Sequence, residues 1–124
     1  MSYTLEIILE EFSVCKLEST EDIDISVPFT FVSRTDKELS LVCPWYTVPD
    51  HVLQREDGWK AFRITGSLDF SLIGVLADIA GILAAERISI FAVSTFDTDY
   101  IFLKTEMFAD GIEALRKKGY TIQG

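Results

Sequence analysis

The C-terminal half of the chain has the clearest pattern of hydrophobic and polar positions. Apolar and polar side chains alternate over residues 60–66, which predicts a strand. After a polar turn, apolar residues recur at helical spacing, namely Leu72, Val75, Leu76, Ile79, Ile82 and Leu83. We therefore expect a helix over residues 71–86, with Asp69 or Ser71 as its N-cap.

A hairpin, a second helix and a last strand are predicted after this helix. Residues 88–94 and 98–104 are rich in β-branched and aromatic side chains and are separated by a short break, as in a hairpin. A helix is expected over residues 107–118, with Gly119 at the position of a C-terminal glycine, and a short strand over 120–123. The order strand, helix, strand, strand, helix, strand predicts an α+β, ferredoxin-like βαββαβ fold.

The N-terminal half is rich in strands. Residues 4–9 and 12–17 are expected to form two short strands, and residues 28–44 a hairpin. Residues 45–58 contain two prolines and read as a connector with one helical turn from Pro49.

The two halves share a short pattern. Residues 32–42 align with residues 93–103, and this alignment places Asp36 on Asp97. The similarity has two interpretations: the alternation that all hairpins share, or a degenerate internal repeat. Under the second interpretation, the N-terminal half is a truncated copy of the C-terminal half that lacks a full first helix.

Composition narrows the classes of protein. The chain has 124 residues, 48% of them hydrophobic, so it is the size of one ordinary domain with a core. A formal charge of −9 argues against nucleic acid as a partner. The longest apolar stretch, residues 72–85, is interrupted by Asp78 and is shorter than the ~20 residues of a membrane span. No signal-peptide pattern is visible, and Cys15 and Cys43 are expected to be buried thiols, so we expect a cytoplasmic protein without a membrane partner.

Catalytic and cofactor motifs are missing from the sequence. The single histidine, His51, is not paired with a serine or cysteine in a recognisable motif. The spacing of Gly66, Gly74 and Gly81 matches neither nucleotide-binding fingerprint, and no metal-ligand spacing is present. We therefore expect no enzymatic activity, no cofactor and no metal.

Two segments carry groups that could bind a small ligand. The first-turn N–H groups of the helix after residues 66–71 would attract a carboxylate. Gly74 lies in this first turn, and a glycine within a helix costs roughly 0.5–1 kcal/mol relative to alanine. Its presence is explained either by the close approach of a ligand or by packing alone. The turn over residues 94–100 combines acids, hydroxyls and aromatics, which is either plain turn chemistry or a site where Asp99 accepts an ammonium group. In the βαββαβ fold this turn returns toward the start of the first helix. A carboxylate site beside an ammonium site suits a free α-amino acid.

At these residues the sequence resembles an ACT domain. The residues that carry the resemblance are Gly58-Trp59, 66–70, Gly74 and 94–100, with 33–43 in the N-terminal half. ACT domains are βαββαβ modules that commonly bind amino acids at interfaces between paired copies. Within the family, the sequence is similar to small bacterial ACT-like proteins related to the cytosolic arginine sensor of the mTOR pathway.

The resemblance implies a domain division, a ligand set and a function. It implies a β-rich, truncated ACT-like unit over residues 1–58 and an ACT-like unit over 59–124. The ligand-binding residues would be Leu72, Ile73, Gly74, Val75, Thr95, Phe96 and Asp99. The implied function is non-enzymatic sensing of a free amino acid, with the site completed by the chain's own halves, by a homodimer or by another protein. The alternative is a structural dimerisation module whose vestigial pocket is filled by Phe70 or Phe96.

Overall fold

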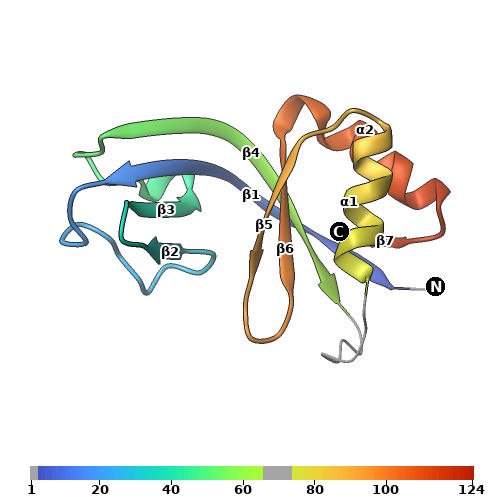
Figure 1. Ribbon diagram of the computed structural model, residues 1–124, viewed down its shortest axis with the longest axis horizontal. Coiled ribbons are helices and arrows are strands. Elements are labelled where there is room, and N and C mark those ends of the chain that lie inside the picture. Colours follow the sequence, from blue (N-terminus) through green and yellow to red (C-terminus); the bar gives the residue numbers. More distant parts are fainter. Residues whose placement is uncertain (1–2, 66–73) are drawn as a thin grey trace. The chain divides into compact units, whose positions relative to one another are not determined.

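The computed structural model describes residues 3–65 and 74–124 (Figure 1). By their internal contacts the residues form two compact units, Met1–Leu9 with Lys60–Gly124, and Glu10–Trp59. The elements along the chain are β1 (Thr4–Leu17), β2 (Phe31–Arg34), β3 (Leu39–Pro44), the 3-10 helix η1 (Trp45–Thr47), β4 (Gln54–Thr65), α1 (Val75–Ala85), β5 (Ile90–Ser94), β6 (Asp99–Lys104), α2 (Thr105–Lys117) and β7 (Thr121–Gln123).

The first unit confirms the predicted α+β, βαββαβ order in β4, α1, β5, β6, α2 and β7. Its strands lie in the order β7, β1, β4, β6, β5, with β7 parallel to β1 and β5 antiparallel to β6. The start of β1 therefore lies between β4 and β7, because Thr4–Glu6 pair with residues 121–123. The pattern of the C-terminal half could not predict this strand, since its residues come from the opposite end of the sequence.

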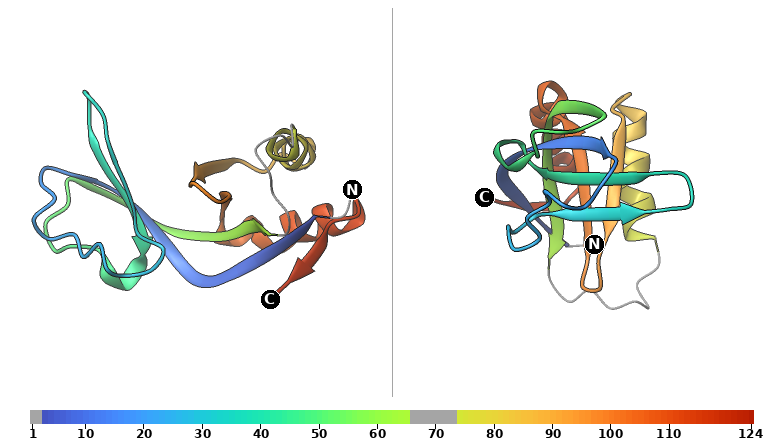
Figure 2. Two further views of the ribbon diagram at one scale, coloured as in Figure 1. Left: turned by 90° about the horizontal axis from the view of Figure 1, so that it is seen from below. Right: turned by 90° about the vertical axis from the view of Figure 1, so that its left-hand side faces the viewer.

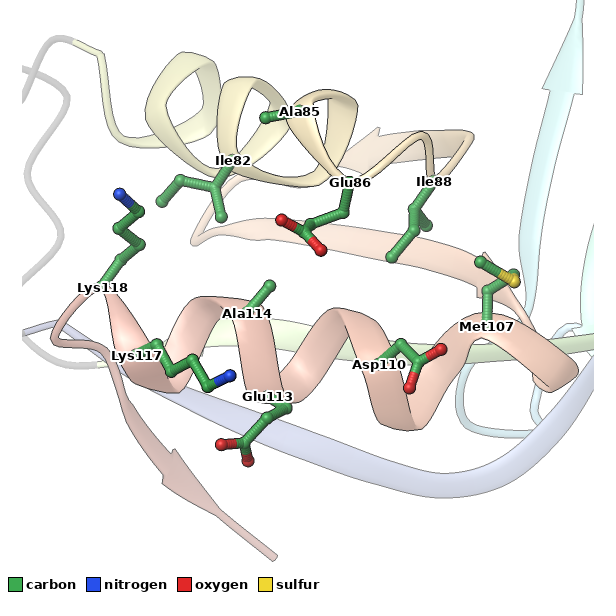
Figure 3. A pocket seen from close by; sticks show the side chains of 10 residues that line it. All are labelled: Ile82, Ala85, Glu86, Ile88, Met107, Asp110, Glu113, Ala114, Lys117 and Lys118. Atoms are coloured by element: carbon green, nitrogen blue, oxygen red, sulfur yellow. The ribbon is translucent and has the colours of Figure 1, made fainter.

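The core of the first unit lies between one face of this sheet and the helices α1 and α2. Residues from alternate strand positions pack against the buried stripes of both helices. The two helices, α1 and α2, lie beside each other (Figure 3). The buried residues of this core are Leu5, Phe62, Ile64, Val75, Ile79, Leu83, Ile88, Ile101, Leu103, Phe108, Ile112, Leu115 and Tyr120.

Both helices end in a left-handed residue. Gly119 has φ 102°, and the Tyr120 N–H bonds the Leu115 carbonyl at 3.2 Å, which confirms the predicted C-terminal glycine. Arg87 occupies the equivalent position after α1 with φ 61°, and the Ile88 N–H bonds the Leu83 carbonyl at 3.0 Å. The turn after each helix thus satisfies carbonyl groups that have no partner within the helix.

Helix α1 begins later than predicted. It starts at Val75 rather than at residue 71, because Gly74 has φ 92°, which a right-handed helix cannot include. The expected N-caps Asp69 and Ser71 lie outside the described residues.

The second unit confirms the predicted hairpin of residues 28–44. In it β2 pairs antiparallel with β3, β3 with β1, and β1 neighbours β4 (Figure 2). Its core consists of Cys15, Leu17, Leu39, Leu41 and Cys43, with Ile23, Val48 and Val52 packed against it. Both cysteines are free and buried, as expected.

Three predictions for this half were wrong in detail. The two strands expected at residues 4–9 and 12–17 form one continuous strand, β1, because the residues between them remain extended and paired. The helical turn expected from Pro49 is instead η1, whose Thr47 hydroxyl donates to the Pro44 carbonyl at 2.9 Å. Strand β4 begins at Gln54, within the expected connector.

The division into ACT-like units over residues 1–58 and 59–124 stays a prediction, since compactness alone does not identify domains.

No helix within residues 3–65 and 74–124 has the length and apolar character needed to cross a lipid bilayer.

Candidate functional site

The turn between β5 and β6 is organised by Thr95. The Thr95 N–H donates to the Thr98 carbonyl at 2.7 Å, and its hydroxyl donates to the same carbonyl at 3.0 Å. The Thr98 N–H in turn donates to the Thr95 hydroxyl at 3.3 Å. Thr95 therefore closes the hairpin, and this role accounts for its place in the sequence motif without a ligand.

Asp99 is the first residue of β6 and stands opposite Ser94 on β5. The Ser94 hydroxyl donates a hydrogen bond to Oδ1 of the half-buried Asp99 carboxylate. An ionised carboxylate has about four acceptor sites, so one hydroxyl leaves acceptor capacity on Asp99. The carboxylate is thus oriented by a neighbour and is able to accept a further donor.

A hydrogen bond from Thr98 fixes this turn beside the end of β4. The Thr98 hydroxyl donates to the Ile64 carbonyl at 2.6 Å, one residue before β4 ends at Thr65. Figure 1 shows the β5–β6 turn, the end of β4 and the start of α1 at the same end of the first unit. The arrangement that the βαββαβ order predicted for these elements is present.

The start of α1 offers backbone N–H groups rather than side chains. Gly74 is the N-cap, and no side chain of the described residues caps the helix. The first intrahelical bond runs from the Asp78 N–H to the Gly74 carbonyl at 2.8 Å, so N–H groups of the preceding turn have no acceptor within the helix. The Val75 side chain is buried in the core, so only its backbone could contact a ligand.

The remaining expected site residues are either exposed or outside the described part of the chain. Phe96 is 85% exposed, so its side chain does not fill a pocket in the first unit. Leu72 and Ile73, and also Phe70, lie outside the described residues. The structure therefore gathers Thr95, Phe96 and Asp99 in one turn and places Gly74 at the same end of the unit.

Sequence reasoning missed the side chains that hold β4 between its neighbours. Nε of Arg63 donates to the Glu6 carboxylate at 2.9 Å, and Nη1 donates to the Tyr100 hydroxyl at 3.0 Å. The bonds to Tyr100 and Glu6 raise the pKa of the Arg63 guanidinium above its usual range. The alternation of residues 60–66 placed Arg63 on the face opposite the core, but its partners come from strands distant in sequence.

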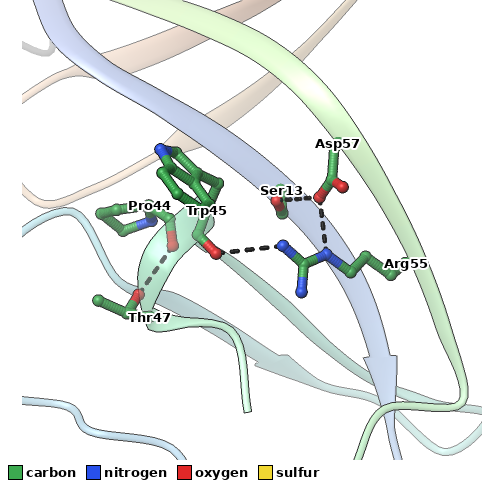
Figure 4. A network of polar contacts seen from close by, with 6 residues as sticks. All are labelled: Ser13, Pro44, Trp45, Thr47, Arg55 and Asp57. Carbon is green, nitrogen blue, oxygen red and sulfur yellow. Dashed lines mark hydrogen bonds and ion pairs between the residues drawn. The ribbon is translucent and has the colours of Figure 1, made fainter. Parts of the chain in front are cut away.

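A second polar network lies in the second unit (Figure 4). The buried Ser13 hydroxyl and Nε of Arg55, the latter at 2.7 Å, both donate to Oδ1 of Asp57. Nη2 of Arg55 also donates to the Trp45 carbonyl at 3.2 Å. The Ser13 hydroxyl, followed by Arg55, lowers the pKa of the Asp57 carboxyl, which makes Asp57 a poor proton acceptor. This network fastens η1 and β4 to β1.

Comparison with known proteins identifies the family. The ACT domain family matches residues 54–117, which include β4, α1, β5, β6 and the whole of α2. The human protein "Cytosolic arginine sensor for mTORC1 subunit 1" is 38% identical over 61 residues, which cover 48% of this chain and 18% of the human protein. The chain thus matches less than a third of the length of these curated relatives: the match covers 18% of the human protein and 30% of the rat protein.

Two solved structures illustrate the similarity in fold. Protein Atu0741 from Agrobacterium tumefaciens superposes with a TM-score of 0.87 at 26% identity, covering 98% of this chain and 92% of that one. Aspartokinase III of E. coli, solved in complex with aspartate and ADP, gives a TM-score of 0.61 at 12% identity, covering 91% of this chain and 32% of that one; at this identity only the fold is shared. With the family match over half of its length, the chain belongs to the ACT domain family.

Proposed function

We propose that the ACT unit binds a free amino acid at the end where the β5–β6 turn, the end of β4 and the start of α1 meet. ACT domains bind small ligands such as amino acids. The sequence match to a protein named as an arginine sensor supports sensing as the function of this unit as well. The proposal includes no catalytic step.

The observation that carries the proposal is the orientation of Asp99. Its half-buried carboxylate is held by the Ser94 hydroxyl at the strand end beside β4. There it accepts the α-ammonium group, in a charge-assisted bond roughly twice as strong as a neutral one.

The other expected residues complete the ligand set. Backbone N–H groups at the start of α1, from Ile73, Gly74 and Val75, hold the α-carboxylate together with the dipole of the helix. Leu72, Thr95 and Phe96 border the ligand. Since Phe96 is 85% exposed, the pocket is closed by a second surface, which a second copy or another protein supplies.

Binding of this kind regulates through a population shift. A ligand changes the equilibrium between two states only by its difference in affinity for them. An amino acid that bridges Asp99 and the start of α1 favours whichever assembly closes the pocket. The module thereby converts amino-acid concentration into a change of assembly.

Thermal unfolding against each of the twenty amino acids tests the proposal. A ligand at ~100 times its dissociation constant stabilises the folded state by roughly 2.7 kcal/mol, which corresponds to several degrees for a domain of this size. We expect one or a few amino acids at millimolar concentration to raise the melting temperature. The Asp99→Asn variant should lose this shift.

Asp97→Asn is the matched control, since Asp97 is an exposed acid in the same turn and the substitution removes the same charge. It should keep the shift. The absence of a response to all twenty amino acids, or a response that Asp99→Asn retains, contradicts the proposal. Self-association without any amino-acid response would instead support the alternative, a dimerisation module with a vestigial pocket.

A further inference from the structure

The outer side of the helical layer contains a groove between α1 and α2 (Figure 3). It has a volume of about 390 Å³ and lies entirely within the first unit. Apolar side chains of Ile82, Ala85, Ile88, Met107 and Ala114 line it, together with Glu86, Asp110, Glu113, Lys117 and Lys118. This face is distinct from the candidate amino-acid site, which lies at the β5–β6 turn.

Helix α2 has a second stripe of residues along this groove. Its buried stripe is Phe108, Gly111, Ile112 and Leu115. Its groove stripe is Met107, Asp110, Ala114 and Lys117, in which successive residues are three or four positions apart. Spacing of three and four is typical of a helix face that packs against another helix.

The charges along the groove are arranged by sign. Asp110 lies toward the end marked by Met107 and Ile88, and Glu86 lies near the middle of the groove (Figure 3). Lys117 and Lys118 lie at the opposite end. Glu113 forms an ion pair with Arg116 at 2.7 Å. In the described part of the chain, the carboxylates of Glu86 and Asp110 and both lysine ammonium groups form no hydrogen bond or ion pair with another side chain, so they are available to a partner.

We propose that this groove binds the same groove of a second copy of the chain, with the two α2 helices antiparallel. A two-fold axis near Glu113 and Ala114 would place Asp110 of each copy opposite Lys117 of the other. Seven residues of helix span ~10 Å, so two separate ion pairs would flank the axis. The small side chains of Ala85 and Ala114 would allow the helices to approach closely.

Charge complementarity favours a second copy over other occupants. A uniformly basic segment would meet Lys117 and Lys118, and a uniformly acidic segment would meet Glu86 and Asp110. A second copy of the same groove, running in the opposite direction, brings acidic residues opposite lysines at both ends. The proposal does not depend on amino-acid binding, because the groove shares no residue with that site.

Charge reversal tests the proposal by sedimentation velocity at low ionic strength. The wild type should dimerise, with weaker association as salt screens the pairs. In a dimer of Asp110→Lys, each of the two symmetry-related contacts between positions 110 and 117 brings two lysines together. In a dimer of Lys117→Glu, each of these contacts brings two carboxylates together. Each variant should raise the dimer dissociation constant at least about tenfold. An equimolar mixture should form a heterodimer, because both contacts then become attractive.

Matched controls separate this effect from net charge. Asp22→Lys and Lys37→Glu make the same charge changes at exposed positions of the second unit and should leave dimerisation unchanged. Far-UV circular dichroism establishes that each variant is folded. A monomeric wild type, a dimer indifferent to both reversals, or a mixture that stays monomeric overturns the proposal. A thermal response to an amino acid would persist in Asp110→Lys, so the two proposals fail separately.

Discussion

The Tyr120 hydroxyl donates a hydrogen bond to the Asp78 carboxylate and so joins the turn after α2 to the first turn of α1. Tyr120 is 5% exposed and belongs to the core of the first unit. Burial, followed by the bond to Asp78, raises the pKa of this phenol. The bond lies between residues far apart in sequence and holds together the two helices that the ACT unit requires.

Removal of this hydroxyl is expected to destabilise the protein. Tyr120→Phe keeps the buried ring and loses one bond to a charged acceptor, which contributes about 1.5–3 kcal/mol in other proteins. Because Asp78 is exposed and water can replace the hydroxyl, we expect the lower part of this range. Chemical denaturation measures the change.

Tyr46→Phe is the matched control for this prediction. Its hydroxyl donates to Glu10 at 2.6 Å, but this bond is exposed and Tyr46 is itself 61% exposed, so its loss should change the stability little. Equal stability of Tyr120→Phe and the wild type would show that the bond between the helices contributes nothing.

Local patterns predicted the elements of the C-terminal half well, and long-range contacts explain the rest. The spacing of Ile79 and Leu83 predicted α1, and Gly119 predicted the end of α2, because both signals act over a few residues. The place of Thr4 beside Thr121 could not be predicted, because strand order depends on pairing between the two ends of the chain.

The candidate site was predictable to the same extent. Asp99 and Thr95 stood out because acids and hydroxyls gather at a turn. The bond between Thr98 and Ile64, which aligns this turn with β4, joins residues 34 positions apart and leaves no signal in local sequence. The start of α1 was misplaced because a glycine near a helix start fits either the first turn or the N-cap, and only its φ of 92° decides.

Two glycines of the same helix region should respond oppositely to alanine. Gly74 has φ 92°, a conformation that costs an L-residue roughly 1–2 kcal/mol, so Gly74→Ala should destabilise the protein. Gly81 lies within α1, where alanine is favoured by roughly 0.5–1 kcal/mol, and no described atom lies within 4 Å of a Cβ there. Gly81→Ala should therefore stabilise. Urea midpoints measure both, and a shared sign would contradict the N-cap conformation of Gly74.

Stability should decrease at alkaline pH because of Cys15. Burial, and then the neighbouring Cys43, raise the pKa of the Cys15 thiol from 9.0 to about 11, against an opposing effect of Arg55. Between these values the unfolded chain releases the proton before the folded chain does. The unfolded state then binds fewer protons, so the free energy of unfolding falls as pH rises through this window.

The slope of stability against pH is the measurement for this prediction. Urea midpoints of the wild type, taken under reducing conditions from pH 8 to 10.5, should fall more steeply than those of Cys15→Ala. Cys43, whose pKa is also raised by burial, leaves some slope in the variant. Parallel slopes would show that the Cys15 thiol titrates equally in both states.

Two leucines of β1 test whether the N-terminal strand belongs to the ACT unit. Leu5 is 0% exposed and packs in the core of the first unit, whereas Leu9, four residues later on the same strand, is 81% exposed. Truncation of a buried leucine costs about 2–5 kcal/mol, because apolar contacts are lost and a cavity remains. Leu5→Ala should therefore lower the unfolding midpoint strongly, and Leu9→Ala should hardly change it. Hydrogen exchange should show the loss of protection in α1 and α2, to which Leu5 is joined only through tertiary contacts. If Leu5→Ala left those helices as protected as in the wild type, residues 54–117 would fold without β1, and its place between β4 and β7 would be dispensable.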